Sequence, residues 1–596
     1  MPLVKVANRT SVQTGKLNRQ QFNGTTLILL EHEGKVKAFQ GTCPHQGTLL
    51  SDGHIEENQI VCPLHQWSFS CLDGKNIQHN KHLKQYTIVE KADQLFLNSD
   101  EFAKTDENEI AEQKIITIRD LPSPKATFIL GHIPQFKAEN KHQVVENWIK
   151  ECGPLFKIHF LGKKFIVSAD PKINAFILKS RPEKFRRFSK INEVLEEIKI
   201  VGVFNAEGSR WTNQRKVIAE ALNLKNVKGF FPALSSKTNS LLQRWKKLEA
   251  QSQKIDVQQE MMRYTVDITT CIAFGYDTNT LEQDGDVIQT HLEKIFPMIN
   301  KRITAPLPVW RYLKSKKDRE FDYALKEIEK TIHVFIQTAK QKLAANPALK
   351  ESPSNLLEAL LVQQETQGKF TDQELFGNVF ITLLAGEDTT SNSISWALYY
   401  IALHPEVMKK VQEEADLVLG NDLYPTRYEQ IDQLKYTEAA ATEGMRLKPV
   451  TPMLYMEALE DTVIHHLKVK KGTAIMMQNQ VPQKDDQYFT NALEFKPERW
   501  VADTGKCPVH GAHQPEVMRA FGAGPRYCPG KNLAMHEMVM ALSMIFKNFD
   551  IQLVVKPEEV QERFAFTMFP ENLLLKINKR KINRPASPTL VSENVL

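Results

Sequence analysis

The sequence predicts a multidomain fold, in which a small antiparallel all-β domain is followed by a mainly α-helical domain with a minor β region. Three observations support this fold class. The chain has 596 residues, which is more than one ordinary domain contains. Short β-branched segments fill about the first hundred residues, and long amphipathic segments follow from about residue 120. Between them, Glu101–Lys114 is charged and poor in large apolar residues, which is typical of a linker.

In the first domain we expect strands at Thr25–Leu30, Val36–Gln40 and Tyr86–Val89, because apolar and β-branched residues there lie between turns rich in Gly, Asn and Asp. The expected boundaries are 1–105 for this domain and 106–119 for the linker.

The second domain is expected to span 120–580, with a flexible tail at 581–596. Apolar residues recur at helical spacing in four segments: Leu325–Leu343, Pro353–Gln364, Asp372–Leu384 and Glu406–Leu419. Thr371, three residues before Glu374, predicts a capping box at the start of a helix. His404-Pro405 predicts the end of that helix.

Composition excludes several classes. Apolar residues make up 42% and charged residues 25% of the chain, and the net charge of only +6 gives no reason to expect nucleic-acid binding. The basic runs Lys179–Lys190 and Lys314–Arg319 predict solvated faces, with docking surfaces for an acidic partner or a membrane as the alternative. Seven cysteines argue against a disulfide framework. No apolar stretch approaches ~20 residues and no signal peptide is evident, so we expect no transmembrane anchor and a cytoplasmic location.

Cys43-Pro44-His45 and Cys62-Pro63-Leu64-His65 place two thiols and two imidazoles in two loops. Zinc is the alternative occupant, but zinc sites more often pair Cys-x2-Cys with His-x3-5-His. Here each arm holds one Cys and one His, which suits a [2Fe-2S] cluster and resembles the Rieske family. The resemblance implies that Cys43, His45, Cys62 and His65 are the ligands. Cys507-Pro508-Val509-His510 copies one arm without a partner arm and is interpreted as a coincidence.

The segment Phe521-Gly522-Ala523-Gly524-Pro525-Arg526-Tyr527-Cys528-Pro529-Gly530 is a glycine-rich turn before a helical run. A thiolate ligand of heme iron needs such a turn, so that backbone amides can face the sulfur. The segment resembles the cytochrome P450 family, from about residue 120 to 580. The resemblance implies heme b, with Cys528 as the iron ligand, Phe521 shielding the thiolate and Arg526 pairing with a propionate.

Further motifs fit the same family. Ala385-Gly386-Glu387-Asp388-Thr389-Thr390 resembles its oxygen-activation motif, which implies that Thr389 stabilises the iron-bound peroxo species and Asp388 relays protons; we expect the glycine and the hydroxyl to interrupt the helix ladder. The alternative is a Thr389 hydroxyl bonded back to its own helix. Glu443, Arg446 and Arg499 resemble the buried Glu-Arg-Arg network.

The segment from Trp211 to Arg215 resembles the family's Trp-x-x-x-Arg pair, which reaches a propionate. A further propionate arginine is missing, because the segment Pro449–Met456 contains none.

The two resemblances imply a heme-thiolate monooxygenase that inserts one atom of dioxygen into an organic substrate. They imply that the Rieske domain passes it electrons one at a time. Since no Gly-x-Gly-x-x-Gly follows an expected strand, we expect a separate flavin-dependent NAD(P)H reductase. Phe376–Leu384 and Pro449–Tyr455 predict an apolar substrate pocket. The alternatives are a peroxide-driven or isomerising heme-thiolate enzyme and a non-catalytic redox or gas sensor.

Overall fold

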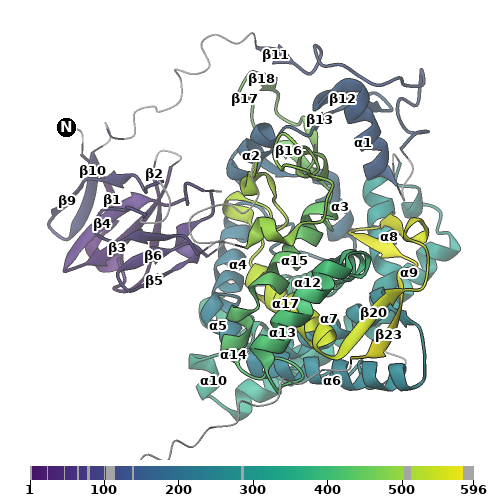
Figure 1. Ribbon diagram of the computed structural model, residues 1–596. Helices are drawn as coiled ribbons and strands as arrows, with labels where there is room; N and C mark the ends of the chain where they lie inside the picture. Colours follow the sequence, from purple (N-terminus) through teal and green to yellow (C-terminus); the bar gives the residue numbers. More distant parts are fainter. Residues whose placement is uncertain are drawn as a thin grey trace, which may run out of the picture.

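A computed structural model describes residues 3–22, 25–45, 47–63, 66–76, 81–98, 101, 115–136, 140–283, 287–305, 307–368, 370–501 and 512–580. Figure 1 shows a purple N-terminal β domain packed against one side of a larger helical domain. The predicted fold class and the predicted order of the two domains are confirmed.

The β domain consists of three antiparallel sheets, with strand orders β1-β10-β9, β2-β3-β4-β8 and β5-β6-β7. Its strands are β1 (Leu3–Asn8), β2 (Asn18–Phe22), β3 (Thr25–His32), β4 (Lys35–Gln40), β5 (His54–Glu56), β6 (Gln59–Val61), β7 (Ser68–Ser70), β8 (Gln85–Tyr86), β9 (Ile88–Lys91) and β10 (Gln94–Asn98). The three strands expected from the sequence lie in β3, β4 and β8–β9.

Strand β3 shows why this domain folds as it does. Successive side chains of a strand point to opposite faces, and here both faces are covered. Leu27 and Leu29 pack into one apolar cluster, whereas Ile28 and Leu30 pack into another. The second cluster also contains Cys43 and Cys62, so the core of the β domain extends directly to the predicted metal ligands.

The second domain is mainly helical. Its helices are α1 (Lys141–Cys152), α2 (Pro171–Lys179), α3 (Ser189–Glu197), α4 (Gly208–Ala221), α5 (Leu224–Gly229), α6 (Phe231–Ala250), α7 (Val257–Phe274), α8 (Val287–Thr304), α9 (Lys316–Ala345), α10 (Ala348–Glu351), α11 (Leu356–Gln367), α12 (Asp372–Leu403), α13 (Pro405–Leu419), α14 (Tyr428–Gln433), α15 (Lys435–Leu447), α16 (Gln480–Gln483) and α17 (Lys531–Asn548). The four expected helices lie in α9, α11, α12 and α13.

Helix α12 runs through the centre of this domain (Figure 1) and is buried on most sides. It begins with the predicted capping box, because the Thr371 hydroxyl accepts from the Glu374 N–H while the Glu374 carboxylate accepts from the Thr371 N–H. It ends at Leu403, and Pro405 starts α13, as predicted.

The minor β region has a main sheet of five strands in the order β12-β13-β19-β16-β14. These strands are β12 (Leu155–Phe160), β13 (Lys163–Ser168), β14 (Phe185–Arg187), β16 (Met453–Ala458) and β19 (Ala474–Gln478). Smaller sheets are formed by β11 (Ile116–Thr117), β17 (Thr462–Ile464) and β18 (Leu467–Val469), by β15 (Ile255–Asp256), β20 (Phe549–Leu553) and β23 (Leu574–Lys579), and by β21 (Gln561–Phe564) and β22 (Met568–Glu571).

Strand β11 pairs with β18 of the helical domain, although its residues fall in the expected linker 106–119. Strand pairing with the helical domain therefore includes Ile116 and Thr117 of the expected linker. The remaining boundaries stay predictions, because 102–114 and 581–596 lie outside the described residues.

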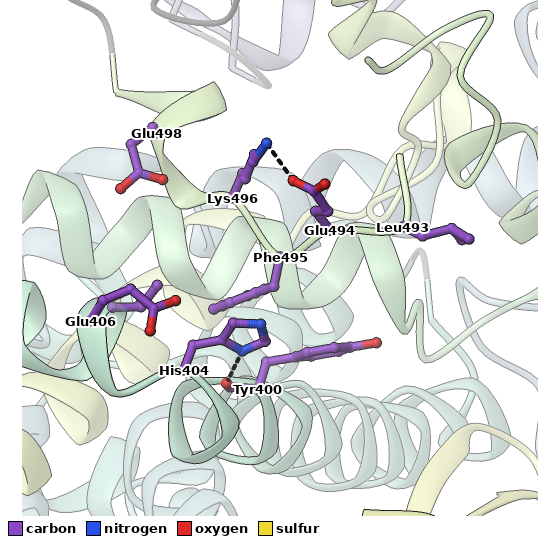
Figure 2. A pocket seen from close by; sticks show the side chains of 9 residues that line it. Tyr400, His404, Glu406, Leu493, Glu494, Phe495, Lys496 and Glu498 are labelled. Carbon is purple, nitrogen blue, oxygen red and sulfur yellow. Dashed lines mark hydrogen bonds and ion pairs between the residues drawn. The ribbon is translucent and has the colours of Figure 1, made fainter. Parts of the chain in front are cut away.

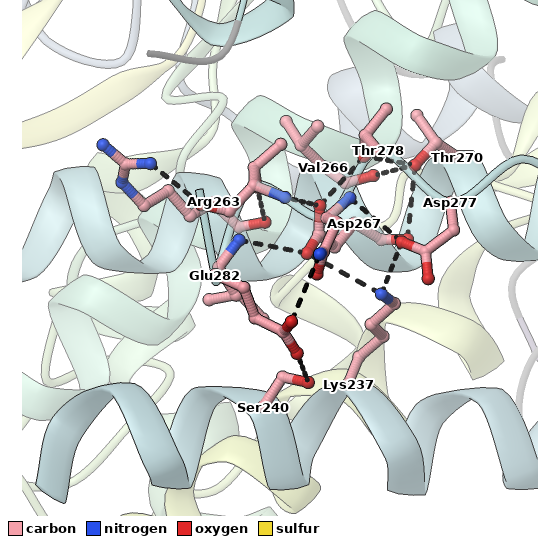
Figure 3. A network of polar contacts seen from close by, with 12 residues as sticks. Lys237, Ser240, Arg263, Val266, Asp267, Thr270, Asp277, Thr278 and Glu282 are labelled. Atoms are coloured by element: carbon pink, nitrogen blue, oxygen red, sulfur yellow. Dashed lines mark hydrogen bonds and ion pairs between the residues drawn. The ribbon is translucent and has the colours of Figure 1, made fainter. Parts of the chain in front are cut away.

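Helix α7, which crosses α12, carries a buried polar network (Figure 3). The Asp267 carboxylate accepts hydrogen bonds from the N–H of Thr280 at 2.7 Å and of Leu281 at 3.2 Å. Lys237 lies 2.6 Å from Asp277 and 3.9 Å from Asp267. Since a buried carboxylate must be hydrogen-bonded, this network fixes the loop after α7 to α6.

Candidate functional site

Cys43 and Cys62 lie in two loops, and each loop is closed by two backbone hydrogen bonds in the same pattern. In each loop the cysteine N–H donates to the residue five positions later, and the residue four positions later donates back to the cysteine carbonyl. The four bonds run from Cys43 N to Thr48 O (2.8 Å), Gly47 N to Cys43 O (2.8 Å), Cys62 N to Trp67 O (2.8 Å) and Gln66 N to Cys62 O (3.0 Å). The two loops are therefore structurally equivalent.

The side chains of these loops fit an iron–sulfur cluster. The Cys43 and Cys62 residues are 2% and 1% exposed, so their thiols lie in an apolar environment. The His45 ring stacks on the Trp67 ring, with a distance of 4.4 Å between centroids. The fourth predicted ligand, His65, lies outside the described residues. Thiolate and imidazole ligands on two equivalent loops match the ligand set of a Rieske cluster.

Cys528 lies in a tight turn between the 3-10 helix η7 (Gly524–Arg526) and helix α17. Its N–H donates to the Phe521 carbonyl at 2.8 Å. Gly524 has a φ of +71°, and a Cβ there would lie 2.2 Å from the Leu178 carbonyl oxygen, so only glycine fits.

The surroundings of Cys528 favour a metal-bound thiolate. Burial raises the pKa of the Cys528 thiol, and the N–H of Gly530, which hydrogen-bonds to it, acts in the opposite direction. The start of α17 adds the positive end of a helix dipole. A buried thiol with a raised pKa loses its proton by binding a metal ion.

Beside this turn lies a cluster of buried arginines. Arg181 is 2% exposed, and its Nε and Nη2 have no hydrogen-bond partner within the described residues. The Nε and Nη1 of Arg526 are also unpartnered, and its guanidinium lies over the Trp211 ring at 4.7 Å. Glu207 binds Arg526 Nη2 at 2.5 Å. Burial and repulsion from Arg187 and Arg526 lower the pKa of Arg181. Burial lowers the pKa of Arg526 to about 10, although Glu207 acts in the opposite direction.

Excess buried positive charge of this kind fits the two carboxylates of heme. Arg187 extends the cluster from β14, where it pairs with Met456 of β16. Met456 belongs to the segment that lacks the expected propionate arginine, so Arg187 lies on the strand next to that segment; its Nε donates to the Phe204 carbonyl at 2.9 Å. Sequence reasoning missed Arg181 and Arg187 because the basic run Lys179–Lys190 was interpreted as a solvated face. That interpretation is wrong for Arg181.

Arg215 makes contacts that the sequence did not predict. Its Nε lies 3.2 Å from Asp52 of the β domain, and its Nη1 donates to the Tyr527 carbonyl at 2.8 Å. Its Nη2 is buried without a hydrogen-bond partner in the described part of the chain, and is the atom that could reach a propionate. The propionate roles of Trp211 and Arg215 stay predictions.

In α12, the Asp388 carboxylate is hydrogen-bonded to two buried polar side chains. Its carboxylate accepts hydrogen bonds from Thr567 at 2.6 Å and from Asn392 at 3.0 Å. Burial raises the pKa of Asp388 to about 6, and these two hydrogen bonds partly oppose the increase. A carboxyl with this pKa changes protonation state near neutral pH.

Thr389 lies on a different face of α12. Its hydroxyl donates to the Ala385 carbonyl at 2.6 Å, which is the alternative considered from the sequence, and Ala385 is exposed in the middle of a mostly buried helix. The expected interruption of the helix is absent, since α12 is continuous from Asp372 to Leu403. Gly386 instead permits close packing, because a Cβ there would lie 2.3 Å from Thr269 Oγ1 of α7. The catalytic roles of Asp388 and Thr389 stay predictions.

The structure brings the Glu443, Arg446 and Arg499 side chains together without solvent exposure. Glu443 lies 2.7 Å from Arg446 and 3.1 Å from Arg499, and it accepts from the Trp500 indole at 2.8 Å. Each buried charge is therefore paired, and the network joins α15 to the 3-10 helix η5 (Pro497–Trp500).

Comparison with known proteins decides the family of the helical domain. The family model of cytochrome P450 matches residues 121–577. The chain belongs to the cytochrome P450 family. Among its relatives, Protein LUTEIN DEFICIENT 5, chloroplastic, of Arabidopsis thaliana is 27% identical over 451 residues, which is 74% of each chain. Cytochrome P450 97B2, chloroplastic, of Glycine max is 27% identical over 73% of this chain and 82% of that protein.

A further relative is the bifunctional cytochrome P450/NADPH–P450 reductase 2 of Bacillus subtilis, 27% identical over 77% of this chain; the match spans 43% of that protein. The Rieske [2Fe-2S] domain model matches residues 3–88. The P450 domain implies heme and the Rieske domain implies a [2Fe-2S] cluster, in agreement with the donor sets described above.

The Rieske domain packs against the P450 domain beside the Cys528 turn. Tyr527 belongs to the same buried apolar cluster as Cys43 and Cys62, and Phe521 packs against that cluster. Leu49 forms a second contact, with Ala206 and Trp211. Tyr527, which precedes Cys528, is therefore in the core that surrounds Cys43 and Cys62.

The P450 domain also has a surface pocket, which is lined by residues such as Tyr400, His404 and Phe495 (Figure 2). Tyr400 stacks on Phe495, with centroids 5.0 Å apart, and His404 Nδ1 hydrogen-bonds to the Tyr400 carbonyl at 2.8 Å. None of the predicted cofactor residues or substrate segments lines it, so it is separate from the sites described above.

Two sequence interpretations cannot be compared with the fold: Cys507 lies outside the described residues, and the substrate pocket stays a prediction. None of the helices in the described part of the chain combines the length and the apolar character that crossing a bilayer requires.

Proposed function

We propose that this P450 monooxygenase receives its electrons, one at a time, from its own Rieske domain and inserts one oxygen atom into an apolar organic substrate. The observation that carries the proposal is the position of Tyr527. This side chain packs with Cys43 and Cys62, and it immediately precedes Cys528 in the chain. A separate flavin-dependent NAD(P)H reductase is the proposed source of electrons for the cluster.

When bound, heme supplies dioxygen activation and the [2Fe-2S] cluster supplies one-electron transfer. Cys43, His45, Cys62 and His65 would hold the cluster, and Cys528 would hold the heme iron. Arg181 and Arg526, with Arg215 through Nη2, would hold the heme carboxylates. Asp388 would take up and release protons at its carboxylate, and the Thr389 hydroxyl would orient dioxygen. The apolar character of the substrate rests on the sequence segment Phe376–Leu384, most of whose apolar side chains are buried in the core of the P450 domain.

The test uses the full chain with NADPH and a flavin-dependent ferredoxin reductase under carbon monoxide. His65→Ala should lose the cluster signal in electron paramagnetic resonance. Enzymatic reduction should then fail to produce the thiolate–carbon monoxide band, although dithionite still produces it. His54→Ala is the matched control, because His54 is a half-exposed histidine of the same domain that pairs with Glu56. Equal enzymatic reduction of the His65→Ala and His54→Ala variants would contradict the proposal.

A further inference from the structure

The Rieske and P450 domains share a buried ion pair. Asp52 belongs to the 3-10 helix η2 (Leu50–Asp52), between the two cluster loops, and Arg215 belongs to α4. The Asp52 and Arg215 side chains are 10% and 4% exposed, and their charged atoms lie 3.2 Å apart. A charge pair this inaccessible to solvent is screened far less than a surface pair.

Arg215 also contacts the turn that carries the heme ligand. Its Nη1 donates to the Tyr527 carbonyl at 2.8 Å, and its guanidinium lies over the Tyr527 ring at 4.4 Å. One side chain therefore joins η2 of the Rieske domain to the residue before Cys528. A shift of Asp52 would remove one of the fixed partners that hold Arg215 against this turn.

Other contacts between the two domains lie beside this ion pair. Trp211, one turn before Arg215 on α4, packs with Leu49, which precedes η2. Lys179 Nζ lies 3.5 Å from the His45 carbonyl, and a Cβ at Gly47 would lie 2.8 Å from the Lys179 side chain. The interface is therefore closely packed around the Asp52–Arg215 ion pair.

The pair contributes to orientation more than to stability. Burial raises the pKa of Asp52, although the Arg215 charge acts in the opposite direction, so desolvation consumes much of the attraction. Buried ion pairs often add little net stability, and they can instead specify one arrangement over others. For two domains of one chain, relative motion is the default expectation unless the interface specifies an orientation.

We propose that Asp52 and Arg215 form the docking pair that holds the Rieske domain in the orientation from which it reduces the heme. Both are positioning residues for electron transfer, and the idea rests on the proposed function. Without the Asp52 charge, the tethered domain samples other orientations, and the observed transfer rate falls with the fraction of molecules that are docked.

The experiment measures the first-order rate of electron transfer from cluster to heme in the full holoprotein under carbon monoxide. A light flash with deazaflavin injects less than one electron per molecule. Asp52→Asn should slow transfer by about tenfold or more, and Asp52→Glu, which keeps the carboxylate, should restore most of the rate. Asp73→Asn is the matched control, because Asp73 pairs with Lys75 inside the Rieske domain. The cluster and heme spectra should be unchanged in all three variants.

Arg215→Lys tests the pair from the P450 side without altering the Rieske domain, and it should also slow transfer, because an ammonium cannot keep the contacts of the forked guanidinium to both Asp52 and Tyr527. Since Arg215 is also proposed to hold a heme carboxylate, slower transfer supports the pair only with a heme spectrum like that of the wild type. It replaces Asp52→Asn if that variant fails to assemble its cluster. If the wild type transfers electrons and Asp52→Asn transfers them at the same rate, the docking pair is overturned and the proposed function stays intact. The same holds for Arg215→Lys where it replaces Asp52→Asn. An absence of transfer in the wild type would overturn both.

Discussion

At the scale of single residues, the raised pKa of Asp388 predicts how the stability of the protein changes with pH. The folded pKa of about 6 exceeds the usual value of 3.8, so the neutral carboxyl is favoured in the folded protein. Stability therefore falls as the pH rises from about 3.8, where the unfolded carboxyl ionises, and levels off once the folded carboxyl has ionised, a little above pH 6. Asp388→Asn removes this cost. The free energy of unfolding of Asp388→Asn minus that of the wild type should therefore be about 1 kcal/mol larger at pH 7 than at pH 5.

Thermal unfolding at several pH values checks this prediction. Asp416→Asn is the control, because Arg580 and Lys547 help to lower the pKa of Asp416, so its carboxylate stays charged in both the folded and the unfolded protein between pH 5 and pH 7, and its effect on stability should not change over that range. A difference between wild type and Asp388→Asn that stays constant from pH 5 to pH 7 would show that Asp388 has an ordinary pKa.

Arg181 makes a prediction about cofactor retention. Its Nε and Nη2 are buried and have no hydrogen-bond partner among the described residues, which suits an anionic partner, and we predict that the heme carboxylates are that partner. A charge-assisted hydrogen bond contributes about 1.5–3 kcal/mol. Arg181→Gln should therefore transfer heme to apomyoglobin about tenfold faster than wild type. Arg210→Gln, at an exposed arginine of α4 that pairs with Glu374, should not differ from wild type. Identical heme loss from the two variants would remove Arg181 from the heme site.

At the scale of secondary-structure elements, the crossing of α7 and α12 depends on Gly386. A methyl group there would approach the Thr269 side chain to 2.3 Å, and a buried threonine has little freedom to move. Gly386→Ala should destabilise the protein by about 2 kcal/mol. Gly229→Ala, at a position on α5 with no neighbour within 4 Å, serves as the control in thermal unfolding. Equal melting temperatures would mean that the two helices can separate slightly without cost.

The sequence predicts elements well where the signal is local. The capping box of Thr371 and Glu374 and the stop at Pro405 are encoded within a few residues, and both ends of α12 are confirmed. The two cysteine–histidine arms and the Cys528 turn are also local. By contrast, the partner of Arg215 is Asp52, 163 positions away in another domain, and no local pattern encodes that contact.

The same reasoning explains Arg181. Its basic neighbours suggested a solvated surface, because sequence spacing shows charge but does not show burial. Its role depends on the position of Arg526, which follows much later in the chain. Local patterns therefore predict the ligands of both cofactors, whereas the contacts that position the cofactors depend on tertiary structure.

At the scale of the whole molecule, the central claim is that the two domains form one electron-transfer unit. The cluster loops and the Cys528 turn share a buried core, and the domains belong to one chain. Transfer between them should therefore be intramolecular, with a rate that is independent of how often molecules collide.

The most direct measurement is the rate of heme reduction by the pre-reduced cluster under carbon monoxide, followed over a tenfold range of protein concentration. The account predicts a single first-order rate constant that does not change on dilution. A rate that falls in proportion to concentration, or a reduced cluster that never reduces the heme, would contradict it.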